Sequence, residues 1–158
     1  MKILSEEEIK TNIETQKHID LVRSFIDRLQ VELYNRAENH DRSKLEKPEV
    51  TQLVDATKKL KSLTYGSKEY SDILNTELKE FKDHHYSNNS HHPEFYDNGI
   101  EGMDLVDVVE MLCDWRAATE RHENGDIYKS LEINRNRFLI SDQLMNILKN
   151  TVDRYFST

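Results

Sequence analysis

Apolar residues recur at helical spacing along most of the chain, and this pattern predicts an all-α protein. Ser5 and Glu8 have the spacing of a capping box, so the first helix is expected to begin there and to end near residues 37–39. His18 falls on the apolar face of this helix and is therefore expected to be buried. The apolar residues that share the face with His18 are Leu21, Val22, Phe25, Leu29 and Leu33.

Five further helices are predicted after the first. Pro48 fits the first turn of a helix that runs to about residue 63, and Ser67 opens a third helix that ends near residue 85. The last three are expected at about residues 103–121 and 127–137, and from a cap at Ser141 to about residue 155. The segment 86–102 is rich in Asn and Gly and reads as a loop of roughly fifteen residues, a length that favours a functional role.

Composition supports one helical domain. The chain has 158 residues, enough to bury a core, and its two prolines and four glycines favour long uninterrupted helices. Apolar residues make up 36% and charged residues 33%, so the helices should be amphipathic. We therefore predict a single-domain helical bundle over residues 1–158.

Charge and cysteine content exclude several classes of protein. A net charge of −8 argues against broad nucleic-acid binding, which needs a basic surface. A small phosphorylated substrate remains compatible, because a bound metal ion reverses the local field. Cys113 is the single cysteine, which rules out an intrachain disulfide and a thiolate zinc cage. No apolar run has the length of a signal peptide or a membrane span, so a cytoplasmic protein without a membrane partner is expected.

Six of the seven histidines fall in three places, and a late aspartate follows them. Histidine and carboxylate side chains are the usual protein ligands of Mn, Fe, Zn and Ni. The ligands of one ion must converge from separate helices. We therefore predict a first metal ion that is bound by side chains from three helices. These ligands are His18, His40, Asp41 and Asp114.

A second ion is expected on the later histidines, with Asp41 as the bridge. We predict His85 and His92 as its ligands, whereas His84 and His91 stay open as alternatives because the sequence does not separate neighbours. Glu110 lies one helical turn before Asp114 and can accept a hydrogen bond from a ligand histidine, although an ordinary solvated face explains it equally well.

The ordered series His18, His40-Asp41 and Asp114 resembles the H…HD…D motif of the HD superfamily of metal-dependent phosphohydrolases. The run His40-Asp41-Arg42-Ser43-Lys44 is similar to the HDxGK variant of binuclear members, with Ser43 in place of Gly. The later His91-His92-Pro93-Glu94 resembles their HHE with an inserted proline, while their GYP motif is absent. The chain also resembles, over nearly its whole length, a domain family of bacteria and phages with HDxSK, HHPE and EMLCDW-like motifs and no assigned activity.

The resemblance implies an HD-like fold and a phosphohydrolase that acts on a nucleotide or another small phosphoester through metal-activated water. It implies one or two ions of Mn, Fe, Zn, Ni or Mg, and Asp41, Lys44 and Glu94 as catalytic residues. Lys44 would contact the substrate phosphate, where an ammonium stabilises the charge on the transferred group. The alternatives are a di-iron HD-type oxygenase and a non-catalytic phage or bacterial factor that binds a nucleotide or a protein. A MazG-like pyrophosphatase ranks last, because it would leave the histidines without a role.

Overall fold

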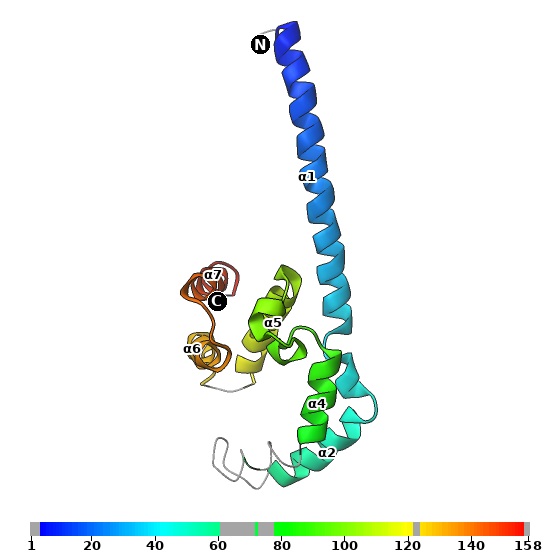
Figure 1. Cartoon of the computed structure of the whole chain (residues 1–158), viewed down its shortest axis with the longest axis vertical. Coiled ribbons are helices and arrows are strands. Elements are labelled where there is room, and N and C mark those ends of the chain that lie inside the picture. The colour runs from blue at the N-terminus through cyan, green and yellow to red at the C-terminus, as the bar shows by residue number, and fades with distance from the viewer. Residues whose placement is uncertain (1–3, 61–71, 73–77, 122–123, 157–158) are drawn as a thin grey trace. The chain divides into compact units, whose positions relative to one another are not determined.

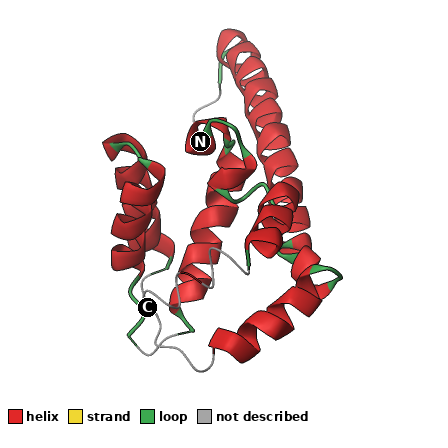
Figure 2. Cartoon of the chain, turned by 60° about the horizontal axis from the view of Figure 1, so that its bottom comes forward, coloured by secondary structure: helices red, strands yellow, loops and turns green. Residues whose placement is uncertain are grey.

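The structure is a computed structural model that describes residues 4–60, 72, 78–121 and 124–156. Across these ranges the chain forms α-helices, short 3-10 helices and loops, with no strand (Figure 2). The predicted all-α class is therefore confirmed. No helix in the described ranges is both long and apolar enough to cross a membrane. The chain divides into two compact units, Met1–Glu38 and Asn39–Thr158, which are considered separately.

Helix α1 (Glu6–Asn39) accounts for nearly all of the first unit and runs without interruption (Figure 1). The predicted capping box is present: the Ser5 amide donates to Glu8 Oε2 at 2.7 Å, and the Glu8 amide donates to Ser5 Oγ at 3.3 Å. None of the residues of α1 is buried, and Phe25 is 51% exposed. The predicted burial of His18 is therefore not found in this unit, because α1 has no partner helix within it.

The second unit begins with a 3-10 turn, η1 (Arg42–Leu45), and helix α2 (Glu49–Leu60). Helix α4 (Lys79–Asn88) is the described end of the predicted third helix, whose residues 67–71 and 73–77 lie outside the described ranges. Because α4 reaches Asn88, the predicted loop starts later than expected. It also contains two 3-10 turns, η2 (Pro93–Phe95) and η3 (Gly99–Gly102).

The last three predicted helices are present as α5 (Leu105–Thr119), α6 (Ile127–Phe138) and α7 (Asp142–Tyr155). Each begins at a polar cap, because the first amides of a helix lack partners inside it. Asp104 caps α5, Asp126 caps α6, and Ser141 caps α7 as predicted.

The main core of the second unit lies among α5, α6 and α7. Burial of each large apolar side chain there contributes about 1.5–3 kcal/mol, and Trp115 also stacks on Phe138 with ring centroids 6.1 Å apart. A smaller cluster of Leu78 and Phe81 packs with Leu53 and joins α4 to α2. The buried residues of the main core are Met111, Leu112, Trp115, Ile127, Leu131, Ile140, Met145, Leu148 and Val152.

The loop after α4 is fixed to the first turn of α5 by Asp107, which is 1% exposed. Ser90 Oγ donates to its Oδ1 at 2.7 Å, and the Tyr96 hydroxyl donates to its Oδ2 at 2.5 Å. Burial and this hydrogen bond raise the pKa of Tyr96 to about 12, so its hydroxyl keeps the proton that it donates. These contacts, called here the Asp107 anchor, fix the segment that carries His91 and His92.

Candidate metal centre

His40 and Asp41 lie where α1 ends and η1 begins. Adjacent residues point about 100° apart on a helix, so both can face one site only at a bend. The bend is present, because Asp41 has φ 53° and ψ 19°, in the left-handed region. Aspartate is among the few residues other than glycine that enter this region readily. The predicted helix junction at His40-Asp41 is therefore confirmed.

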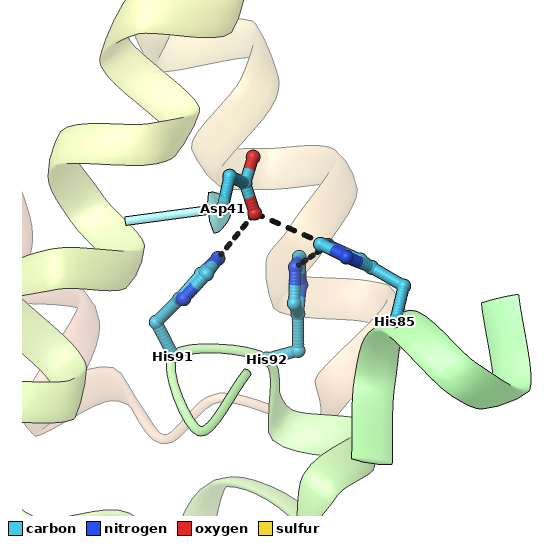
Figure 3. A group of neighbouring side chains, drawn as sticks. All are labelled: Asp41, His85, His91 and His92. Atoms are coloured by element: carbon cyan, nitrogen blue, oxygen red, sulfur yellow. Dashed lines mark hydrogen bonds and ion pairs between the residues drawn. The ribbon is translucent and has the colours of Figure 1, made fainter. Parts of the chain in front are cut away.

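Three histidines gather around Asp41 in the three-histidine group, which comprises Asp41, His85, His91 and His92 (Figure 3). Their potential ligand atoms all lie within 4.8 Å of one another. Asp41 Oδ1 is 3.2 Å from His85 Nε2 and 3.6 Å from His91 Nε2. His85 Nε2 is 2.9 Å from His92 Nε2. The ring nitrogens from α4 and from the loop thus converge on one carboxylate oxygen.

The other oxygen of Asp41 belongs to a second cluster, the His40 group, which comprises His40, Asp41 and Asp114. His40 Nε2 lies 3.5 Å from Asp41 Oδ2 and 3.7 Å from Asp114 Oδ1. Asp41 therefore offers Oδ1 to one group and Oδ2 to the other. This is the arrangement expected of a carboxylate that bridges two ions.

Buried carboxylates orient His40, His85 and His91 by contacting the Nδ1 atom of each ring. Glu110 Oε1 lies 2.8 Å from His40 Nδ1 and 3.1 Å from His91 Nδ1. Glu49, which is fully buried, places Oε2 3.0 Å from His85 Nδ1. An ionised carboxylate can only accept, so each Nδ1 must carry the proton. In the neutral rings, Nε2 then has a lone pair directed at the site, as in metal-binding histidines.

Two buried atoms of the three-histidine group indicate whether an ion fits between its side chains. Asp41 Oδ1 and His91 Nε2 are buried and have no hydrogen-bond partner among the described residues. Both are acceptors in the tautomer just derived, so they cannot bond to each other, whereas a cation between them satisfies both. Burial, together with neighbouring His91 and His85, lowers the pKa of His92 to about 3, which keeps that ring neutral. The donor set therefore fits a divalent ion of the Mn, Fe, Ni or Zn kind.

Two positive charges of the chain, on His40 and Lys44, offset part of the negative charge of the carboxylates. Hydrogen bonds to Asp114 and Glu110 raise the pKa of His40 to about 10. Burial opposes ionisation of Asp41, yet the neighbouring His85 ring and the hydrogen bond from Lys44 outweigh it and hold the pKa of Asp41 well below its usual range. The Lys44 ammonium donates to Asp41 Oδ2, so it faces the site as its position in the η1 turn predicts.

The structure brings together most of the residues singled out from the sequence. His40, Asp41, His85, His92 and Asp114 all belong to the two groups, and His91 joins them. His84 instead contacts Glu49 Oε1 at 2.7 Å, with a side chain 40% exposed.

Two predicted residues are members of neither group. His18 is exposed on α1 in the first unit, so its role as a ligand stays a prediction. The carboxylate of Glu94 pairs with Arg137 at 2.6 Å, and its catalytic role also stays a prediction.

Glu49 and Asn89 contact the site but were not among the residues predicted for it. Glu49 is an acidic residue in the first turn of α2, where such residues are common for reasons of helix electrostatics alone. Asn89 donates to the carbonyl of His85 at 2.7 Å and to Ser43 Oγ at 3.0 Å. Only the position of Asn89 four residues after His85 could have suggested this contact.

The fold and the site define an all-α protein with a partly buried cluster of histidines and carboxylates, side chains of the kinds that bind metal ions. The chain belongs to the family of unknown function DUF5662, whose family model matches residues 7–154. The matched range covers both groups and α1 apart from its first residue. No curated protein and no solved structure matches the chain.

Proposed function

We propose that the protein is a metal-dependent phosphohydrolase that acts on a nucleotide or another small phosphoester. The observation that carries the proposal is the position of Asp41, whose two oxygens face two separate groups of potential ligands. The resemblance of His40-Asp41 and Asp114 to the HD motif supports it, because that superfamily hydrolyses phosphoesters with ions held in this order.

Each group has a role in the proposed chemistry. The three-histidine group would hold one ion, and the His40 group, with His18 as a further predicted ligand, would hold the other. Two divalent ions supply a water nucleophile at neutral pH and neutralise charge on the phosphoryl oxygens. Lys44 cannot act as a ligand while protonated, because an ammonium has no lone pair. It would instead place its positive charge against a phosphate bound beside Asp41.

A di-iron oxygenase is the second candidate, and the carboxylate shared between two groups of histidine and aspartate donors favours it. The same nitrogen and oxygen donors suit iron as well as Zn or Mn. Metal identity separates the two functions, because a coloured, redox-active iron centre without phosphatase activity would favour the oxygenase. Tight stoichiometric binding of a nucleotide without turnover would favour a non-catalytic factor instead.

The direct test is elemental analysis of the purified protein, followed by a phosphoester screen with the metal found. We expect one or two equivalents of a divalent metal in the native chain and loss of most of it in Asp41→Asn. Asp97→Asn is the matched control, because Asp97 is exposed and belongs to neither group. Full metal content in Asp41→Asn would exclude the proposed centre.

A further inference from the structure

An open cavity of about 910 Å³ lies beside the metal-binding groups. His92 and Asp114 form part of its wall, so it adjoins both groups. Its volume falls within the range of roughly 300–1,000 Å³ typical of small-molecule sites. The rest of its wall comes mainly from α5, α6 and the connection between them.

Asp114 and Ala118 on α5 line one face of the cavity, which continues to Arg121, two residues after α5 ends at Thr119. The backbone keeps turning after Thr119, because Glu120 is in the right-handed helical region and the Arg121 amide donates to the Ala118 carbonyl at 3.3 Å. Seven residues in helical conformation advance about 10 Å along the axis. The small side chain of Ala118 leaves space between the two charged ends. Arg121 therefore lies at the opposite end of this face from the metal-binding groups.

On α6, the basic residues fall at both ends of the cavity. Lys129 lies in the first turn of α6, next to the short connection from α5, so it lies at the same end as Arg121. Arg137 lies in the last turn, and its Nη2 is 3.5 Å from the Tyr86 hydroxyl. The Tyr86 ring lies 4.8 Å from the ring of His92, which places Arg137 at the metal end.

The whole chain has a net charge of −8, but each acidic residue in the cavity wall already interacts with another group of the chain. Glu94 pairs with Arg137, and Asp114 belongs to the His40 group. Asp126 Oδ1 caps α6 by accepting from the amide of Tyr128 at 2.8 Å, and its other oxygen lies 4.0 Å from Lys129 Nζ. The Arg121 guanidinium has no hydrogen bond or ion pair with another described residue. Among the described lining residues at the end far from the metal groups, two cations, Arg121 and Lys129, therefore accompany a single carboxylate, that of Asp126.

We propose that the cavity binds a small phosphoester that has a second anionic group, a phosphate or a carboxylate, about 10 Å from the phosphate at the metal groups. The first phosphate lies beside His92 and Asp114, and the second anion lies between Arg121 and Lys129. Charge-assisted hydrogen bonds from a guanidinium are strong and suit both kinds of anion. The assignment of the first phosphate rests on the proposed function.

Two synthetic probes test the second anion directly, namely hexane-1,6-diol bisphosphate and hexyl phosphate, which differ only in one phosphate. Calorimetry on the Mn²⁺-loaded protein should show that the bisphosphate binds at least about tenfold more tightly, as expected for one or two charged hydrogen bonds. The double variant Arg121→Gln/Lys129→Gln should lose this advantage and keep its affinity for hexyl phosphate. The control Lys58→Gln/Lys79→Gln removes the same charge from exposed positions on α2 and α4 and should keep the advantage.

Equal affinity for the two probes in the native protein, absence of binding of both, or an advantage that survives in Arg121→Gln/Lys129→Gln would each overturn the proposal. Turnover of p-nitrophenyl phosphate is measured separately. A preference for the bisphosphate without turnover of any phosphoester would disprove the hydrolase and retain the two-anion site. Turnover without the preference would retain the hydrolase and disprove the two-anion site.

Discussion

His40 Nε2 lies near the carboxylates of Asp41 and Asp114, and its proton must leave before an ion can bind to that nitrogen. The pKa of His40 is raised to about 10, so the ring is protonated at neutral pH in the metal-free protein. Release of this proton when an ion binds in the His40 group makes the apparent affinity of that group rise with pH, by up to about tenfold per unit, until pH approaches 10. Competition with a chromophoric chelator at several pH values between 6.5 and 8.5 measures this slope. A flat profile would contradict it.

Lys44 offers a second test at the scale of one side chain. Lys44→Ala should keep its bound metal, because an ammonium is not a ligand, but should lose turnover. Loss of this charge should raise the barrier by on the order of 2–4 kcal/mol, with most of the effect in kcat. Steady-state kinetics and metal analysis of the same preparation measure both properties. Arg42→Ala, at an exposed neighbouring position, is the control, and native turnover in Lys44→Ala would leave Lys44 without a catalytic role.

At the scale of elements, the sequence predicted where most described helices begin and end, since caps such as Ser5 and Ser141 act locally. It did not separate His84 from His85, because the packing of α4 decides which of two adjacent side chains faces Asp41. His85 lies 5.6 Å from Phe81 between ring centroids and is buried, whereas His84 is partly exposed. The role of Glu49 was missed for the same reason, since its burial depends on how α2 packs against α4.

The Asp107 anchor predicts how the loop after α4 contributes to stability. Tyr96→Phe removes one hydrogen bond to a buried carboxylate and should lower the free energy of unfolding by about 1–2 kcal/mol. Release of metal to a chelator should also be faster, because the segment with His91 and His92 is less firmly fixed. Urea unfolding and stopped-flow chelation measure the two effects.

Tyr128→Phe is the matched control for the anchor. The Tyr128 hydroxyl also donates to a carboxylate, that of Asp153, but both residues are exposed. The expected change in the free energy of unfolding is therefore within about 0.5 kcal/mol. Equal effects of the two variants would show that the Asp107 anchor has no special role.

At the scale of the whole molecule, the first unit contains His18, whereas every residue of the two groups comes from the second unit. The HD-like order predicts that His18 is a ligand, so His18→Ala should lower the metal-to-protein ratio. His122→Ala is the control, because His122 is the one histidine outside the three places in the sequence where the other six fall. Elemental analysis of both variants measures the ratio, and an unchanged ratio in His18→Ala would confine the ligands to residues 39–158.

The concentration of carboxylates around the histidines also has a chromatographic consequence. With histidines counted as neutral, the formal charge of −8 becomes −6 with one divalent ion (−8 + 2) and −4 with two (−8 + 4). Even if His40 releases a proton when an ion binds, that ion leaves the chain less negative by one unit (2 − 1). Anion exchange should therefore sort the purified protein by metal content, with metal-poor molecules eluting last.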